Sequence, residues 1–138
     1  MDIREAEDRD WLALRQLYLA QRQLTFSYLD TSSYQLSDFE SDTEGERLWV
    51  ASLSTEIIGF ISVWPADSFI HHLYVDSVHQ GKGVGSQLLA EVQFTYSELS
   101  LKCNVQNHKA LEFYAAKGFV RDSQGGDGLE SYYLMKLN

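Results

Sequence analysis

The sequence predicts an α/β fold in which a mixed sheet is covered by helices. Short apolar runs with strand periodicity alternate along the chain with longer segments of helical periodicity. One of the strand-like runs leads directly into a glycine-rich turn and a helix. The chain has 138 residues, and a domain usually takes ~150. We therefore expect a single domain over residues 1–138 with its own hydrophobic core.

In the first half, helical spacing of apolar residues begins at Trp11, shortly after Asp8, a residue type favoured as a helix cap. Two strand-like runs separated by three residues predict a hairpin. Pro65 ends the second run because it has no amide hydrogen for the ladder. The expected elements are a strand over 3–6, a helix over 9–24, a polar loop with one weak helix over 31–46, and strands over 48–53 and 57–64.

In the second half, Val84, Leu88 and Val92 lie four residues apart and form the apolar stripe of a helix. From Leu99 to Val105, apolar and polar residues alternate as they do in a strand. Gly118 follows the last helical segment and can adopt the left-handed closing turn. The expected elements are a strand over 69–75, a helix ending near 96, a strand over 99–105, a helix over 107–117, and strands over 119–121 and 132–137 around a mobile loop over 125–128.

Composition and charge narrow the class of function. With 11 Lys and Arg against 20 Asp and Glu, the net charge is −9, so nucleic acid is not an expected partner, because phosphate neutralisation drives most of that affinity. Cys103 is the only cysteine, which excludes an intramolecular disulfide. The most apolar run, 57–64, is far shorter than the ~20 residues of a membrane span. Because 1–5 also lacks the pattern of a secretory signal, we expect a soluble, cytoplasmic protein with no membrane partner.

The sharpest local signal is Gln80-Gly81-Lys82-Gly83-Val84-Gly85-Ser86, which lies between a strand and a helix. Three alternate glycines let the backbone turn tightly and bring its amide hydrogens close to a ligand. The first turn of the helix adds unpaired N–H groups and a partial positive charge, and Lys82 can add a full charge. The pattern indicates a pyrophosphate site, and the simpler alternative is a glycine-rich turn without a ligand.

Several other chemistries do not fit. A dinucleotide-binding fingerprint needs a glycine where Ser86 stands, and a P-loop needs a glycine at Asp76 and a serine or threonine at Gly83. No Gly-x-Ser-x-Gly elbow indicates a serine hydrolase. His71 and His72 are weak metal candidates, because adjacent strand residues diverge and no cysteine or carboxylate spacing accompanies them. We expect no metal.

Gln80, Gly83 and Gly85 stand in the order Gln-x-x-Gly-x-Gly, after a strand that ends in Leu-x-Val. This segment resembles the acetyl-CoA motif of the GNAT superfamily of N-acetyltransferases. The segment Asn107–Phe119 resembles the second motif of that family, and the order of elements agrees over nearly the whole chain. Ser77 stands where the family often has proline, a departure that concerns the turn rather than the chemistry.

The resemblance implies a mostly antiparallel, twisted mixed sheet of about seven strands flanked by about four helices. Strands four and five of such a sheet splay apart and leave a slot for the pantetheine arm of acetyl-CoA. The implied activity is acetyl transfer from acetyl-CoA, as co-substrate, to an amine that attacks the thioester directly in a ternary complex. Because family members are often dimers, a possible homodimer is also implied.

The resemblance also assigns roles to matching positions. Backbone groups of Leu73 and Val75 would contact the pantetheine and the acetyl carbonyl, although both residues can equally be core positions of a strand. The amides of residues 81–86 would hold the pyrophosphate, and Asn107 would contact the cofactor. The implied cofactor-binding residues are Leu73, Val75, Gln80, Gly81, Lys82, Gly83, Val84, Gly85, Ser86, Asn107 and Tyr114.

Tyr114 is the candidate general acid. It follows Asn107 by about two helical turns, so both side chains can face the same slot. A phenol of pKa about 10 beside a leaving thiolate of pKa about 8.5 can donate or share a proton. The simpler alternative for Tyr114 is an aromatic side chain on the core side of its helix.

His71 is the candidate general base, because something must take a proton from an acceptor amine that is cationic at neutral pH. It has the strand parity of Leu73, and an imidazole of pKa about 6.5 suits the task. Four alternatives stay open: a packed structural role for His71, Asp67 as the base, Glu40 as the base, or a chain of waters.

Five acidic residues crowd the segment that borders the acceptor site in the family: Asp38, Glu40, Asp42, Glu44 and Glu46. We interpret them as a solvated acidic loop rather than a recognition site. The acceptor is expected to be a cationic primary amine on a small molecule, a peptide lysine or an amino terminus. Alternatives are a non-catalytic acyl-CoA-binding sensor, an O-acetyltransferase and a longer-chain acyltransferase. Cys103, on the apolar side of its strand, is expected in the core.

Overall fold

The computed structural model describes residues 1–137 and places seven strands in one sheet of order β1-β2-β3-β4-β5-β7-β6. All neighbouring strands are antiparallel except β4 and β5, which are parallel. The strands are β1 (Asp2–Glu5), β2 (Arg47–Leu53), β3 (Glu56–Trp64), β4 (Phe69–Val75), β5 (Ser100–Asn104), β6 (Val120–Gly125) and β7 (Tyr132–Lys136). The helices are α1 (Trp11–Thr25), α2 (Asp38–Thr43), α3 (Val84–Thr95) and α4 (His108–Ala116). The predicted mixed, mostly antiparallel sheet with four helices is confirmed.

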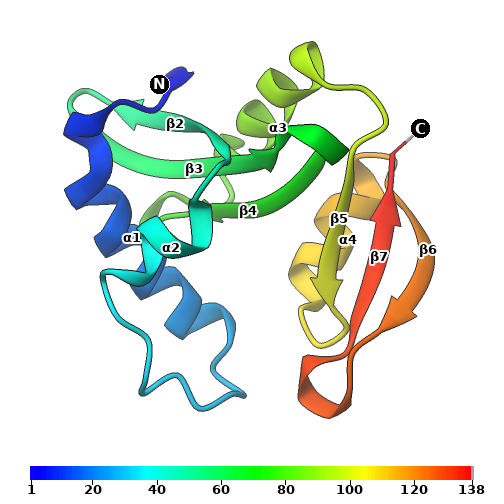
Figure 1. Ribbon diagram of the computed structural model, residues 1–138. Helices are drawn as coiled ribbons and strands as arrows, with labels where there is room; N and C mark the ends of the chain where they lie inside the picture. The colour runs from blue at the N-terminus through cyan, green and yellow to red at the C-terminus, as the bar shows by residue number, and fades with distance from the viewer. Residues whose placement is uncertain (138) are drawn as a thin grey trace.

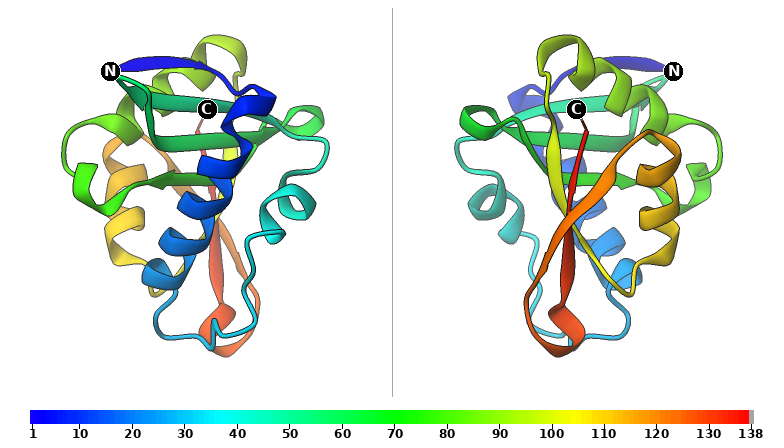
Figure 2. Two further views of the ribbon diagram at one scale, coloured as in Figure 1. Left: turned by 90° about the vertical axis from the view of Figure 1, so that its left-hand side faces the viewer. Right: turned by 90° about the vertical axis from the view of Figure 1, so that its right-hand side faces the viewer.

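Helices lie on both faces of the sheet, as Figures 1 and 2 show. On the face of α1 and α2, the buried side chains of Leu14, Tyr18 and Phe39 meet Val50 and Phe60 of the sheet. Within residues 1–137, the longest helix has 15 residues and no helix combines the length and apolar character needed to cross a bilayer.

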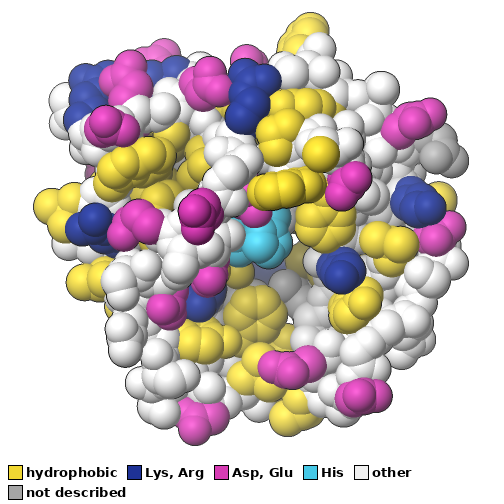
Figure 3. Space-filling model, viewed as in Figure 1, with side chains coloured by type: hydrophobic (Ala, Val, Ile, Leu, Met, Phe, Trp, Pro, Cys, Tyr) yellow, Lys and Arg dark blue, Asp and Glu magenta, His cyan; other side chains and the backbone are white. Residues whose placement is uncertain are grey.

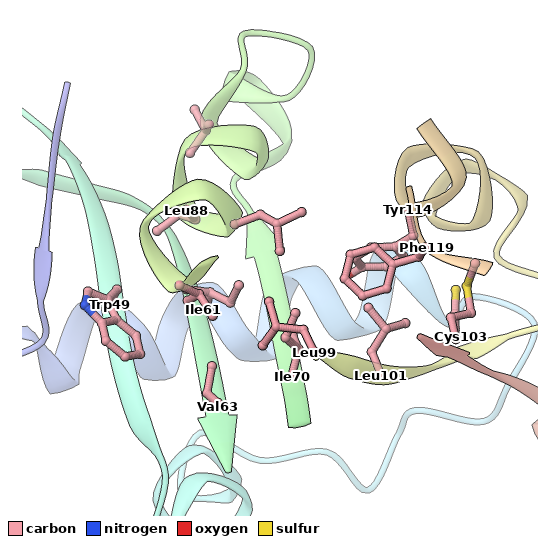
Figure 4. Close-up of a cluster of buried hydrophobic side chains, with 14 of the residues drawn as sticks. Trp49, Ile61, Val63, Ile70, Leu88, Leu99, Leu101, Cys103, Tyr114 and Phe119 are labelled. Atoms are coloured by element: carbon pink, nitrogen blue, oxygen red, sulfur yellow. The ribbon is translucent and has the colours of Figure 1, made fainter. Parts of the chain in front are cut away.

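On the face of α3 and α4, a larger cluster joins the two halves of the sheet (Figure 4). Leu88 of α3 packs with Ile61 of β3, while Tyr114 of α4 and Phe119 lie together over the region of Leu101. The ring centroids of Tyr114 and Phe119 are 5.5 Å apart in an edge-to-face arrangement, which favours their packing. The cluster fixes α4 against β5.

The start of α1 differs from the prediction of Asp8 as its cap. A 3₁₀ turn over Asp8–Asp10 comes first, and the buried acid there is Asp10. Asp10 accepts hydrogen bonds from both terminal nitrogens of Arg4, at 2.8 and 2.9 Å, and from the amide of Glu7 at 2.8 Å. A charge-assisted bidentate pair therefore ties the helix start to β1.

The acidic segment is also different from the solvated loop we expected. Asp38 and Glu40 lie on α2 and pair with Arg22 and Arg15 of α1, at 2.9 and 2.7 Å. Asp42 of the same helix accepts a hydrogen bond of 2.6 Å from the hydroxyl of Tyr18, and Arg22 lies 3.7 Å from it. These carboxylates hold α2 against α1, a pairing between segments that sequence periodicity does not report.

Strand β6 is longer than the expected strand over 119–121. It pairs with β7 as far as Gly125 and Tyr132, with a register shift between Arg121 and Ser123. Five of its six residues are exposed, because β6 lies at the edge of the sheet. An edge strand with both faces in solvent carries no alternation of apolar residues, so sequence periodicity does not show its full length.

The parallel contact between β4 and β5 is short. Only Phe69 with Ser100 and Ile70 with Leu101 are paired. Beyond these two pairs the strands diverge, as Figure 1 shows: they start side by side, after which β4 runs to the left and β5 runs downward. The predicted splay of strands four and five is confirmed, and it opens the sheet in its middle.

Candidate active site

A cleft of about 770 Å³ occupies the space where β4 and β5 part. Its walls come from β4, β5, the first turns of α3 and α4, and the end of α1. Histidine side chains appear at the edge of a hollow near the middle of the face in Figure 3, with acidic side chains to one side. Ten of the eleven predicted cofactor-binding residues line the cleft, all except Lys82.

The loop before α3 has a row of unpaired amides, and every residue from Gly81 to Ser86 except Lys82 lines this cleft. The first hydrogen bond of α3 runs from the amide of Gln87 to the carbonyl of Gly83, at 3.1 Å. In residues 1–137, none of the six N–H groups from Gly81 to Ser86 donates to a protein acceptor. Six donors at the positive end of a helix form a site for an anion.

Two glycines give this loop its shape. Gly81 and Gly83 have φ of +78° and +82°, in the left-handed region that side chains with a Cβ rarely adopt. A Cβ at either position would meet no protein atom within 4 Å. The glycines are therefore required by the backbone conformation, and the space above them is free for a ligand.

Two lysines that sequence reasoning did not single out, Lys102 and Lys109, line the cleft. Lys82 is exposed and does not line the cleft, whereas Lys109, on the first turn of α4, does. Its Nζ donates to Oε1 of Gln80 at 2.9 Å, and Nε2 of Gln80 donates to the carbonyl of Val75 at 3.0 Å. Gln80 thus links the end of β4 to α4 across the mouth of the cleft.

The backbone of β4 directs polar groups into the opening. The amide of Asp76 donates to the carbonyl of Ile58, next to β3, at 2.8 Å. Alternate residues of an antiparallel strand turn their N–H and C=O groups to the same neighbour. Leu73 and Val75 therefore turn theirs the other way, toward the side from which β5 has diverged. Their backbone groups thus face the opening between β4 and β5, which the resemblance assigns to the pantetheine arm.

Tyr114 and Asn107 both reach the cleft, as their spacing on α4 predicts. Asn107 also caps α4, since its side chain accepts a hydrogen bond of 3.3 Å from the amide of Ala110. Tyr114 is 8% exposed, and its burial raises the pKa of its hydroxyl above the ordinary value. The phenol is thus protonated at neutral pH and can act as a donor.

Cys103 is buried, as expected, and also contributes to the cleft wall. Burial raises the pKa of its thiol to about 11. Because the thiolate is the nucleophile, a thiol with this pKa is inert at neutral pH. The site therefore has no activated cysteine to form a covalent acetyl intermediate.

The two histidines on β4 overturn one expectation. Ser62 of β3 is opposite His72 and Val63 is opposite Ile70, so His71 is an extra residue that forms a β-bulge. The rings of His71 and His72 lie 3.9 Å apart with 31° between their planes. The prediction that these neighbours point to opposite faces is wrong, because the bulge interrupts the alternation.

The same bulge changes the parity of His71. Leu73 and Val75 pack toward the α3 and α4 face, whereas His72 and Tyr74 pack with Tyr18 on the α1 face. Since its ring stacks on that of His72, His71 belongs to the α1 side and does not share the face of Leu73. It still lines the cleft, with 45% of its side chain exposed.

His71 and His72 have different hydrogen-bond partners. Nδ1 of His71 is hydrogen-bonded to Oε2 of Glu46, a carboxylate that is only 5% exposed. Nε2 of His72 faces the carbonyl of Asp42 at 3.2 Å and must donate to it. His72 is 8% exposed, and burial lowers its pKa to about 4. It is therefore neutral at physiological pH.

The other candidate bases lie elsewhere. Asp67 is in the 3₁₀ turn before β4 and does not line the cleft. Glu40 is paired with Arg15 and does not line it either. Among the carboxylates and imidazoles considered for the role, His71 is the one that faces the cleft and is partly exposed.

Sequence reasoning missed several lining residues. Gln21 and Phe26 come from the end of α1, and Lys102 from β5, beside Cys103. With its amide oriented to satisfy both neighbours, Gln21 donates to the carbonyl of Val75 and accepts from the amide of Ser77, each at 3.2 Å. The sequence did contain a signal for Gln21, because it lies on the apolar stripe of its helix. A buried amide needs hydrogen-bond partners, so a glutamine there indicates a polar neighbour.

Comparison with known proteins agrees with this fold and site. Residues 18–129 match the family of acetyltransferase (GNAT) domains. The chain is 29% identical to N-acetyltransferase 8 of Homo sapiens over 78% of its own length and 54% of that protein. It is 25% identical to the L-amino acid N-acetyltransferase AaaT of Escherichia coli, over 98% of this chain and 96% of that protein. The chain thus spans about half of the first relative and nearly all of the second.

A solved structure gives the same arrangement. The PaiA N-acetyltransferase of Thermoplasma acidophilum, in complex with coenzyme A, superposes with a TM-score of 0.80 at 18% identity, over 98% of this chain and 96% of that one. At this identity the likeness concerns the fold. Because the family match covers most of the chain, the protein belongs to the GNAT acetyltransferase family, as the motifs predicted.

The buried, neutral state of His72 predicts a pH-dependent stability. Between the ordinary pKa of about 6.5 and the folded value of about 4, the unfolded chain binds a proton that the folded chain does not. The free energy of unfolding therefore decreases as the pH falls through this range. Urea unfolding at pH 7.5 and 4.5 should show that His72→Gln loses about 2 kcal/mol less on acidification than the parent. Equal losses in the two proteins would contradict a buried neutral His72.

Proposed function

We propose that this protein transfers an acetyl group from acetyl-CoA to a primary amine, by direct attack within a ternary complex. The observation that carries the proposal is the cleft at the divergence of β4 and β5, whose lining includes five of the six residues with unpaired amides, Gly81 and Gly83 to Ser86. These amides would hold the diphosphate of acetyl-CoA, and Lys109 would add a positive charge nearby. Family membership supports the same assignment.

The pantetheine arm would follow the backbone of β4. Leu73 and the N–H of Val75 face the opening with polar groups that no neighbouring strand occupies, so they can bond pantetheine, whereas the carbonyl of Val75 already accepts from Gln80. We assign the N–H of Val75 to the thioester carbonyl, where it would stabilise the oxyanion that forms on attack. The side chain of Asn107 completes the cofactor contacts at the start of α4.

The reaction requires proton transfers in addition to acyl transfer: two protons leave the acceptor nitrogen and one is added to the sulfur. His71 takes a proton from the acceptor ammonium, and the free amine attacks the thioester carbonyl carbon to form the C–N bond. The intermediate collapses with cleavage of the C–S bond, and Tyr114 donates a proton to the leaving sulfur. The amide nitrogen releases its second proton to solvent, Tyr114 regains one from solvent, and His71 releases its own. The net products are the acetamide, free CoA and one proton.

The inert state of Cys103 supports direct transfer rather than an acetyl-enzyme. The raised pKa keeps the hydroxyl of Tyr114 protonated, so a proton is available for donation. The same shift makes this hydroxyl a weaker acid than a tyrosine exposed to water. A thiolate in the same buried environment also has a raised pKa, because burial disfavours both anions. The proton can therefore still move to the sulfur.

We propose a cationic acceptor, in line with the net charge of −9, which favours approach of a cation over an anion. The relative AaaT is named for action on L-amino acids, whose amino group is one such acceptor. A small-molecule amine and a peptide lysine both have the required chemistry. Homodimerisation and a cytoplasmic location stay predictions.

The proposal is tested by following free thiol release from acetyl-CoA over a panel of amino acids, polyamines, lysine peptides and alcohols. We expect release that depends on an amine. Calorimetric binding of acetyl-CoA without release on any acceptor would favour the non-catalytic sensor. Release with alcohols, or with longer acyl-CoA donors alone, would favour an O-acetyltransferase or another acyltransferase.

Removal of one hydroxyl tests the general acid. Tyr114→Phe should lower kcat about 100-fold, a typical loss for a proton donor, and leave the affinity for acetyl-CoA within about twofold. Tyr133 packs against the same cluster but does not line the cleft, so Tyr133→Phe is the matched control and should keep the parent kcat. A Tyr114→Phe enzyme with parent kcat would remove this role from the mechanism.

A further inference from the structure

Glu46 is a carboxylate of the acidic segment that makes no pair with α1 and whose side chain is only 5% exposed. Asp38, Glu40 and Asp42 bond residues of α1, but Glu46 turns inward to Nδ1 of His71. Its Oε1 is buried and has no hydrogen-bond partner in the described residues. An unsatisfied buried oxygen costs free energy. Such an oxygen beside a reaction cleft indicates that the position serves the chemistry rather than the stability.

The backbone before Glu46 sets its direction. Gly45 has φ of +80°, and a Cβ there would lie 2.9 Å from Cζ3 of Trp64. The amide of Glu46 also donates to the carbonyl of Thr43 at 3.0 Å, which anchors the turn to the end of α2. The carboxylate is thus fixed before any substrate arrives, as a positioning group must be.

The hydrogen bond to Glu46 determines which nitrogen of His71 carries the proton. A carboxylate accepts, so Nδ1 of His71 donates and Nε2 is left with the lone pair. The ring lines the cleft and is partly exposed, so this lone pair is available to a substrate. His72 is not equivalent, because it is buried and its Nε2–H is used by Asp42.

We propose that Glu46 is a positioning residue for acetyl transfer: it holds His71 in the tautomer with a free Nε2 and stabilises the imidazolium that forms on proton abstraction. The inference rests on the proposed function. The other ionisable groups around His71 are His72 beneath it, Asp42 on α2 and Lys102 across the cleft on β5. None of these three is hydrogen-bonded to the ring of His71 in the described residues, whereas Glu46 is.

A metal site is the competing use of these side chains. Glu46, His71 and His72 each offer one ligand atom, and these atoms all lie within 4.8 Å of one another. A metal ion lies close to the plane of each imidazole that binds it, because the lone pair lies in that plane. Two rings whose centroids lie 3.9 Å apart and whose planes are tilted by 31° direct their lone pairs nearly side by side rather than toward one point. The geometry therefore favours the proton-transfer role.

The experiment compares Glu46→Gln with Glu44→Gln, an exposed neighbour outside the cleft. Loss of the carboxylate should lower kcat/KM at least tenfold, with unchanged affinity for acetyl-CoA. It should also change the acidic limb of the pH–rate profile, because the charge that stabilises the imidazolium of His71 is removed. Glu44→Gln should match the parent. A parental profile for Glu46→Gln would overturn the proposal.

A double-mutant cycle and one spectrum decide whether Glu46 acts through His71. Adding Glu46→Gln to His71→Gln should cause no further loss of kcat/KM, whereas additive losses would contradict a shared role. Independently of any variant, the imidazole ¹⁵N spectrum of the parent should show His71 protonated at Nδ1. Protonation at Nε2 would overturn the inference even if acetyl transfer is established.

Titration with ZnCl₂ tests whether Glu46, His71 and His72 bind a metal ion instead of transferring a proton. We expect no stoichiometric binding that depends on these residues. Tight one-to-one binding of Zn²⁺ to the parent, lost in both His71→Gln and Glu46→Gln, would assign the cluster to a metal instead. A failure of the acceptor panel, by contrast, would remove the proposed function while leaving the tautomer measurement valid.

Discussion

The short parallel contact between β4 and β5 is the constraint on which the rest of the structure depends. With only two paired positions, the remainder of β4 keeps backbone donors and acceptors that no strand satisfies. An unpaired strand edge in the middle of a sheet is costly unless a ligand or water bonds it. The divergence therefore both creates the cleft and supplies polar groups that an extended, amide-containing ligand can satisfy.

The two sides of that cleft are held by different forces. On one side, apolar packing around Leu88, Leu101 and Tyr114 fixes α3 and α4, which carry the amide row and the phenol. On the other side, ion pairs of α2 with Arg15 and Arg22 of α1 fix the wall that carries Glu46 and the histidines. The anion-binding end and the proton-transfer end are thus supported separately, so changes at one need not disturb the other.

Features encoded within a few residues could be predicted from the sequence. The turn at Gly83, the start of a helix at Asn107 and the spacing to Tyr114 each depend on local geometry, and the structure places these features close to where the sequence predicts them. The bulge at His71 could not be predicted, because it depends on the register with Ser62 of β3. The same holds for the bond between Glu46 and His71, which joins segments 25 residues apart. The presence of Lys109 in the cleft lining could not be predicted either, since it depends on how α4 packs beside β4 and β5.

The central claim is that the amides of residues 81–86 bind the diphosphate of acetyl-CoA. The most direct measurement is a titration of the ¹⁵N-labelled protein with CoA, followed through its amide signals. Charge-assisted hydrogen bonds from these donors should give the amides of Gly81 to Ser86 the largest downfield proton shifts in the protein. Saturable binding that leaves those signals unmoved, with the large shifts on another face, would contradict the claim.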